Sequence, residues 1–128
     1  MLGDKNVLSN VAVKDLAEAK KFYGELLGLK QMGDDESMGI LFSSGPRDGR
    51  IFVYQAPTAG SGKATICSWE VDDIKDVATK LGEANVKFEH YEFPGAEHDG
   101  PIHIMGGMKA AWFRDPSGNI LGLSEIRA

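Results

Sequence analysis

Few residues of this chain are suited to acid–base or metal chemistry, and its three histidines are the clearest of them. His98 and His103 lie in a glycine-rich stretch, "PGAEHDGPIHIMGG", and His90 precedes it in "FEHYEF". Imidazoles and carboxylates bind Zn²⁺ and similar ions, so His98, His103 and a neighbouring acid could form a metal site. Two ligands from one loop need further ligands from elsewhere, so we predict no metal ion there. His90 is predicted to be an exposed strand residue.

The single cysteine and the carboxylates form no recognisable catalytic pattern. Cys67 lies in "TICSWEV", a predicted strand with no histidine close in sequence, which favours packing over reactivity. One cysteine excludes an intramolecular disulfide and a multi-thiolate metal site. Glu70 would act as a general base only if it were desolvated. We therefore predict no catalytic residue and no cofactor.

Composition narrows the class of protein. The chain has 128 residues, 42% of them hydrophobic, and a net charge of −5. This length predicts one globular domain, residues 1–128, and the scattered cations give no basic stripe for nucleic acid. No apolar run is long enough to cross a membrane, and no leader is evident, so we expect a cytoplasmic protein.

The chain contains an internal repeat. "VAVKDLAEAKKFYGELLGL" and "SWEVDDIKDVATKLGEANV" each read as a strand end followed by an amphipathic helix. Asp15 is the predicted N-cap of the first helix and Asp73 that of the second, 58 residues later, and Gly28 is predicted to end the first helix. Each helix should therefore cover one face of the strands of its own half.

Strands should follow each helix. Residues 38–42 and 50–55 form one predicted pair, and "KAAWFRDPSGNILGLSEI" forms the other around a strong turn signal. Residues 30–33 and 86–91 would add one strand to each half, whereas 94–107 is predicted to be a long loop, either a lid or a plain connector. The result is an α+β fold of two βαβββ modules, about residues 7–57 and 64–126, whose mixed sheets form a concave, partly closed barrel with the helices outside.

These two modules, together with "VKDLAEAKKFYGELLGL" and "WFRDPSGNILGL", resemble the vicinal oxygen chelate superfamily. That superfamily includes glyoxalase I, extradiol dioxygenases, fosfomycin-resistance enzymes and bleomycin-binding proteins. The resemblance implies a metal ligand near the start of the first strand of each module and another on the strand after each hairpin. In this chain the corresponding residues are Leu8, Val53, Ile66 and Gly122, and none of them has a lone pair for a metal ion.

The last strand carries one carboxylate, Glu125, three residues beyond Gly122. Side chains alternate along a strand, so Glu125 should point with Leu121 and Leu123 to the face opposite Gly122. We therefore predict that the terminal strand supplies no metal ligand.

The same alternation predicts which side chains line a cleft between the modules. Asn10 and Ser68 are equivalent in the repeat and would face one another, and Trp112 or Phe113 would join them, depending on register. The predicted ligand-binding residues are Asn10, Val53, Gln55, Ser68, Glu70, His103 and Trp112. An apolar lining with a few polar groups is typical of a small-molecule site, although the same pattern also fits a filled core.

The resemblance and the missing ligands together predict a metal-independent protein that sequesters a small, partly apolar organic molecule, as bleomycin-binding proteins do. A metal-dependent lyase, isomerase or dioxygenase with an atypical site, and a dimeric structural module without a ligand, remain the alternatives. The expected partners are a small organic molecule and a second copy of the chain, forming a homodimer.

Overall fold

The computed structural model describes residues 1–126, and these form two compact units. The first contains residues 1–62 and the turn 115–119, and the second contains residues 63–114 and the segment from Ile120 onward. We call them unit 1 and unit 2. Each unit holds one helical segment and one mixed sheet, which confirms the α+β fold with two sheets.

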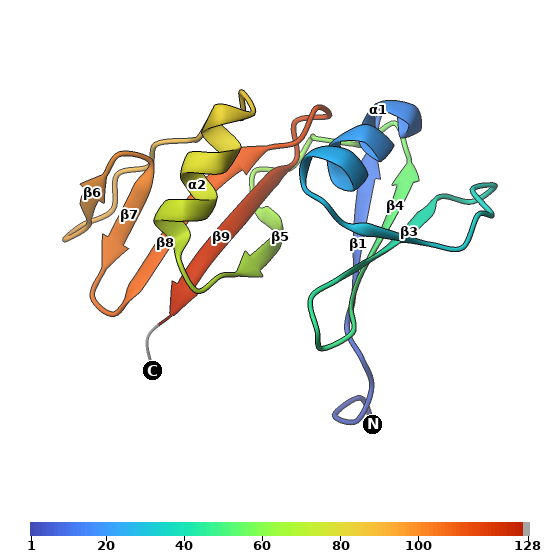
Figure 1. Cartoon of the computed structure of the whole chain (residues 1–128), viewed down its shortest axis with the longest axis horizontal. Helices are drawn as coiled ribbons and strands as arrows, with labels where there is room; N and C mark the ends of the chain where they lie inside the picture. The colour runs from blue at the N-terminus through green and yellow to red at the C-terminus, as the bar shows by residue number, and fades with distance from the viewer. Residues whose placement is uncertain (127–128) are drawn as a thin grey trace. The chain divides into compact units, whose positions relative to one another are not determined.

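Unit 1 is built on a four-stranded sheet in the order β1-β4-β3-β2 (Figure 1). Its strands are β1 (Leu8–Val13), β2 (Lys30–Met32), β3 (Ile40–Ser44) and β4 (Gly49–Gln55). β1 and β4 are parallel, and the other two pairs are antiparallel. The crossover between β1 and β2 is helix α1 (Leu16–Lys20), which continues without a break as the π-helical segment η1 (Lys21–Leu26).

The predicted cap and stop of the first helix are confirmed. The Asp15 carboxylate accepts a hydrogen bond from the Glu18 amide at 3.1 Å and so satisfies one of the free N–H groups of the first turn. Beyond the helix the chain turns at Gly28, whose φ of +77° suits glycine. Tyr23 and Ala19 are buried on the side of the helical segment that faces the sheet. The buried sheet residues on the helix side are Val11, Val13, Ile40, Phe42, Ile51 and Val53.

Unit 2 holds a five-stranded sheet in the order β5-β9-β8-β7-β6. Its strands are β5 (Thr65–Glu70), β6 (Glu97–Asp99), β7 (Ile102–Met105), β8 (Met108–Arg114) and β9 (Ile120–Ile126). Again the first strand is parallel to its neighbour, β9, and the remaining pairs are antiparallel.

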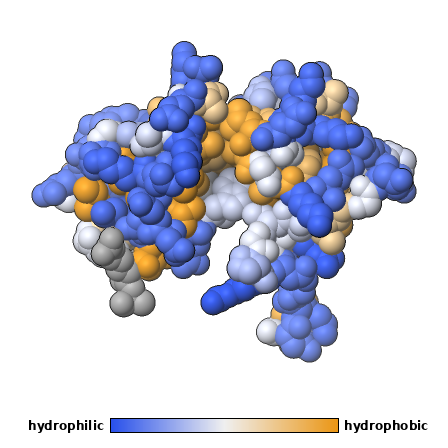
Figure 2. Space-filling view, in the orientation of Figure 1, coloured by the Kyte–Doolittle hydropathy of each residue, from blue (hydrophilic) through white to orange (hydrophobic). Residues whose placement is uncertain are grey.

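Helix α2 (Ile74–Glu83) lies across one face of this sheet (Figure 1). It buries Ile74, Ala78 and Leu81, which recur at helical spacing, and its outer side is hydrophilic (Figure 2). The Asp73 carboxylate caps it by accepting from the Asp76 amide at 3.1 Å. The repeated cap in the sequence therefore produces the same helix start in both units.

In the second module, residues 86–107 differ from the prediction. Residues 86–91 form no strand and make only one isolated bridge, Phe88 to Phe113. The stretch 94–107, predicted to be a long loop, instead contains the hairpin β6–β7. Gly100 and Gly106 have positive φ angles in the two turns that flank β7, so the glycines that suggested a loop serve tight turns.

Neither sheet closes on itself, since each ends in two edge strands. Within residues 1–126, no helix is long and apolar enough to span a membrane.

Candidate functional site

Each sheet has one face covered by its helix and one face without a helix, which we call the helix-free face. In unit 1 the helix-free face carries Leu8, Asn10 and Ala12 of β1 with Phe52 and Tyr54 of β4. In unit 2 it carries Ser68 and Glu70 of β5, Gly122 and Ser124 of β9, and Trp112 of β8. The predicted cleft residues can be located on these faces.

Four of the predicted ligand-binding residues share the helix-free face of unit 2. Ser68 pairs with Gly122, and Gly122 pairs with Trp112, so their side chains project to the same side. Glu70 follows Ser68 at strand spacing, and the His103 ring lies 4.9 Å from the Trp112 ring. The choice left open between Trp112 and Phe113 is settled, because Phe113 is fully buried on the side of α2.

In unit 1 the register differs from the prediction for two residues. Asn10 lies on the helix-free face as expected, but Val53 is fully buried with Val11 on the helix side, and Gln55 shares the side of Val53. The prediction placed β4 one residue out of register, because its alternation of apolar and aromatic residues gives no clear polar face. Phe52 and Tyr54 lie on the face predicted for Val53 and Gln55, and their rings stack with centroids 6.1 Å apart.

This register also corrects one position of the family's metal pattern. Asn10 and Ser68 are equivalent in the repeat; Ser68 pairs with Gly122 and Asn10 pairs with Phe52. The counterpart of Gly122 is therefore Phe52, and Val53 was the wrong choice. Leu8, Ile66, Phe52 and Gly122 carry only hydrocarbon or no side chain, so these four positions hold no donor atom.

Gly122 is also too closely packed to be replaced by a carboxylate without a shift. A Cβ atom there would lie 3.3 Å from Ser68 Cβ and 3.4 Å from Trp112 Cδ1. Glu125, the nearest acid along the strand, points to the face opposite Gly122, as the alternation predicted. Its carboxylate is buried on the helix side and accepts from the Ile74 amide at 3.0 Å, at the N-terminus of α2.

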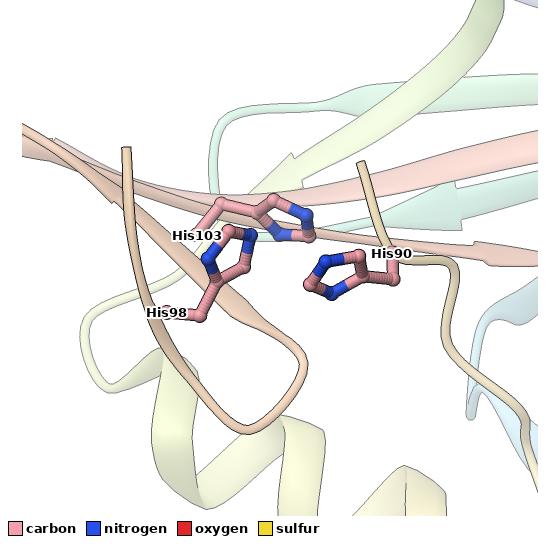
Figure 3. Close-up of side chains that lie close together, drawn as sticks. All are labelled: His90, His98 and His103. Atoms are coloured by element: carbon pink, nitrogen blue, oxygen red, sulfur yellow. The ribbon is translucent and has the colours of Figure 1, made fainter. Parts of the chain in front are cut away.

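The three histidines come together in unit 2, including His90, which was predicted to be an exposed strand residue apart from His98 and His103. Figure 3 shows the rings of His90, His98 and His103 directed toward one another. We call them the histidine cluster: each offers one ring nitrogen, and these atoms lie within 4.8 Å of one another. His98 and His103 face each other across the β6–β7 hairpin, and His90 comes from the irregular segment before it.

Two of these rings hold the backbone of Tyr91. The Tyr91 amide donates to His103 Nε2 at 2.9 Å, and His98 Nε2 lies 3.0 Å from the Tyr91 carbonyl oxygen, to which it donates. Because an amide can only donate, His103 Nε2 must accept, and the proton of the neutral ring is on Nδ1. His103 is 0% exposed, and its Nδ1 has no hydrogen-bond partner among residues 1–126.

The third ring is paired with an acid. His90 Nε2 lies 2.6 Å from a carboxylate oxygen of Glu92. This hydrogen bond, with the positive charge of His90 as a further cause, holds the pKa of Glu92 below its ordinary value. Around the cluster lie aromatic rings, with Tyr91 at 5.2 Å and Phe93 at 5.8 Å from Trp112.

Sequence reasoning missed this cluster, although "HDGPIH" carries a signal for it. Asp-Gly marks a hairpin turn, and a two-residue turn at Gly100 and Pro101 places His98 directly opposite His103. The contribution of His90 has no such local signal, because it depends on tertiary contacts.

Unit 1 contains a separate surface hollow of about 480 Å³, lined by Glu18, Lys21, Phe22, Glu25, Leu26 and Pro116. It is shallow, lies along the helical segment and includes none of the predicted ligand-binding residues. We therefore do not assign the ligand site to it.

Comparison with known proteins identifies the class of this chain. Residues 7–123 match the model of the Glyoxalase/Bleomycin resistance protein/Dioxygenase superfamily, so the chain belongs to that superfamily.

Similar solved structures include TnmS3, an antibiotic binding protein from Streptomyces sp. CB03234, with 26% identity and a TM-score of 0.74 over 99% of this chain and 100% of that one. A glyoxalase/bleomycin resistance protein from the same organism has 26% identity and a TM-score of 0.70, over 93% and 98%. Lactoylglutathione lyase from Agrobacterium tumefaciens has 17% identity and a TM-score of 0.72, over 98% and 96%, which is a likeness of fold alone.

Proposed function

We propose that this protein binds a small, partly apolar organic molecule, of the kind that antibiotic-binding members of the superfamily bind, and that side chains rather than a metal ion hold it. The observation that carries the proposal is the chemistry of the four family positions. Leu8, Phe52, Ile66 and Gly122 offer hydrocarbon where a metal-dependent member has donor atoms.

The exposed apolar surface supports the proposal. Leu8 is 45% exposed on the helix-free face of unit 1, and Ile66, at the irregularity of β5 between Thr65 and Cys67, is 37% exposed, although both are large aliphatic residues of the sheets. Burying such surface is favourable by roughly 25 cal/mol per Å². On the helix-free face of unit 2, Ser68 and Glu70 supply the few polar groups that would orient a ligand, and Trp112 supplies a flat aromatic contact. On the helix-free face of unit 1, Asn10 is the corresponding polar residue.

A second copy of the chain is the other partner that we propose. A homodimer would remove exposed apolar side chains of the helix-free faces from water, and light scattering after gel filtration should give twice the monomer mass. We further propose a cytoplasmic location, as expected from the sequence.

Ligand binding can be tested by thermal denaturation with a panel of antibiotics, bleomycin among them. A ligand at a hundred times its Kd stabilises the native state by about 2.7 kcal/mol, which raises the Tm by several degrees. The test compares Trp112→Ala with Trp69→Ala, since Trp69 lies on the helix side of β5 beside Phe113. The proposal requires the Tm shift in chelator-treated protein, and its loss in Trp112→Ala but not in Trp69→Ala.

A metal-dependent lyase, isomerase or dioxygenase with an atypical site is the second candidate, and the histidine cluster is the observation that favours it. Such an enzyme would lose activity with chelator. The sequestering protein would keep its ligand affinity under the same treatment.

A further inference from the structure

We propose that the histidine cluster, His90, His98 and His103, binds one divalent transition-metal ion, with Zn²⁺ as the reference ion. This site goes beyond the proposed function. It lies on β6, β7 and the segment before them, whereas the family's positions in this chain lie on β1, β4, β5 and β9.

The cluster supplies the right donors at nearly the right spacing. Three imidazole nitrogens lie within 4.8 Å of one another. The His90 and His98 rings are stacked, with their centroids 4.4 Å apart and their planes at 25°. Zn–N distances of 2.0–2.1 Å place nitrogens about 3.3 Å apart in a tetrahedral site. An imidazole binds a metal ion in the plane of its ring, so the stacked His90 ring must turn before it and His98 can bind the same ion, and His90 is exposed and so has room to turn.

A buried nitrogen gives independent support for a ligand at this place. His103 Nδ1 is shielded from solvent and has no hydrogen-bond partner among the described residues, and the ring is directed at His90 and His98 (Figure 3). Buried polar atoms are nearly always paired in native proteins. An unpaired nitrogen that faces two further imidazoles therefore points to an occupant that contacts all three.

Two of the rings already have the outer contacts that metal-binding histidines need. Such a histidine donates its second N–H to a carboxylate or a backbone carbonyl, which fixes the tautomer and the ring orientation. His90 Nε2 has the Glu92 carboxylate at 2.6 Å, and His98 Nε2 has the Tyr91 carbonyl at 3.0 Å. In both rings the lone pair is then on Nδ1, so each ring must present Nδ1 to the ion if it is to keep this hydrogen bond.

The third ring couples metal binding to the position of Tyr91. Without metal, the Tyr91 amide occupies the lone pair of His103 Nε2, so the ring proton is on Nδ1. Coordination through Nδ1 requires that proton to move to Nε2, where it would face the Tyr91 N–H. The metal and the Tyr91–His103 hydrogen bond therefore exclude each other, and binding must turn the Tyr91 amide away from His103 while its carbonyl keeps the hydrogen bond from His98.

The donor set selects the kind of ion. Neutral imidazoles suit Zn²⁺, Ni²⁺, Co²⁺ and Cu²⁺, whereas Mg²⁺ and Ca²⁺ prefer oxygen ligands. Three protein ligands also leave one tetrahedral position open for water or an anion.

The direct test is calorimetric titration of untagged, chelator-stripped full-length chain with ZnCl₂. We expect one Zn²⁺ per chain, no comparable binding of Mg²⁺, and at least a tenfold weaker Zn²⁺ affinity for His90→Gln and for His98→Gln. Asp48→Asn, which changes an exposed ion pair with Arg50 in unit 1, is the matched control and should keep the wild-type affinity. Absence of stoichiometric Zn²⁺ binding, or an unchanged affinity in the His90→Gln/His98→Gln double variant, overturns the proposal.

A second measurement tests His103 without replacing a buried residue. In long-range ¹H–¹⁵N spectra, Zn²⁺ should shift one ring nitrogen of all three histidines, and the tautomer of His103 should change. In a Trp69→Phe background the fluorescence of Trp112 should change too, because its ring lies 5.2 Å from Tyr91. Zn²⁺-induced shifts confined to His90 and His98, as at a surface site, contradict the proposal.

These outcomes separate the metal site from the proposed function. Zn²⁺ binding without any effect of chelator on antibiotic affinity supports both proposals. Loss of antibiotic affinity on chelation would leave the metal site standing and refute metal-independent ligand binding.

Discussion

The two units start from the same plan and differ at one edge. In unit 1 the chain leaves the helix at Gly28 and forms strand β2, which pairs with β3 through backbone hydrogen bonds. In unit 2 the segment after α2 forms no strand, and the backbone of Tyr91 is held by the side chains of His98 and His103. The repeat thus keeps a helix on a mixed sheet. In unit 2 the strand that pairs with β8 is β7, and the segment after the helix keeps one backbone bridge and is held further by imidazoles.

The units also anchor themselves differently. The turn 115–119 belongs to unit 1, where the Asp115 carboxylate accepts from the Tyr23 hydroxyl at 2.7 Å and from the Ser117 and Asn119 amides at 2.9 Å. Asn119 extends this network to the Ala12 carbonyl at 2.7 Å. In unit 2 the buried acid is Glu125, which accepts from the Ile74 amide at the N-terminus of α2 and lies 3.9 Å from the Lys109 ammonium. The comparison teaches that a duplicated fold tolerates different polar anchors as long as each is fully hydrogen-bonded.

The largest expected effect is on the anchor of unit 1. Asp115→Ala leaves the Tyr23 hydroxyl and two buried amides without their acceptor, so we expect a loss of about 3 kcal/mol or more in the free energy of unfolding. Urea denaturation measures it. Asp48→Asn, at an exposed ion pair of the same unit, should change stability by less than about 0.5 kcal/mol. Equal effects of the two substitutions would contradict the difference in anchoring.

The second largest loss of stability is expected when the hydrogen bond between Tyr91 and His103 in unit 2 is removed. His103→Leu keeps most of the side-chain volume but removes the acceptor of the Tyr91 amide, so we expect a loss of about 1–3 kcal/mol. Hydrogen exchange should become faster at Tyr91, whereas the β2 amides of unit 1 should keep their protection. If the Tyr91 amide exchanges at the wild-type rate, the segment is held by other contacts.

The helix starts allow a matched comparison between the units. Glu125→Gln weakens a charged acceptor at the N-terminus of α2, and we expect a loss of about 1 kcal/mol. Asp15→Ala removes the cap of α1 in unit 1 and should also cost about 1 kcal/mol. Thermal unfolding of both variants and of their double variant should give additive losses, since the two substitutions lie in different units.

The smallest expected effect is a change in the pKa of one carboxyl group, that of Glu92. The hydrogen bond from His90 lowers the pKa of Glu92, so His90→Gln should raise this pKa toward its ordinary value of 4.5. Because the folded pKa is depressed, the contribution of this pair is present above the ordinary value and is lost as the pH falls through the folded pKa. NMR titration measures the shift. In unit 1 the pKa of Glu36 is lowered by hydrogen bonds from Lys20 and Gln31, and it should not move in the same variant.

The sequence by itself determined the fold class, the family and the chemical character of the family's metal positions. The repeated Asp caps and apolar helix stripes act locally, and so the residue pattern alone is enough to recognise Asp15 and Asp73 as helix starts. The period of two along β9 likewise placed Glu125 on the helix side, because a buried face fixes strand register.

Only the tertiary structure decided the register of β4 and the meeting of the histidines. In β4, aromatic and aliphatic residues alternate, and either set could face the helix until β1 and β3 pair with them. His90 joins His98 and His103 because the segment before β6 turns back beside the hairpin, a path set by long-range contacts such as the Phe88–Phe113 bridge. Side-chain spacing along the chain carries local information, whereas a site assembled from three segments depends on how those segments pack.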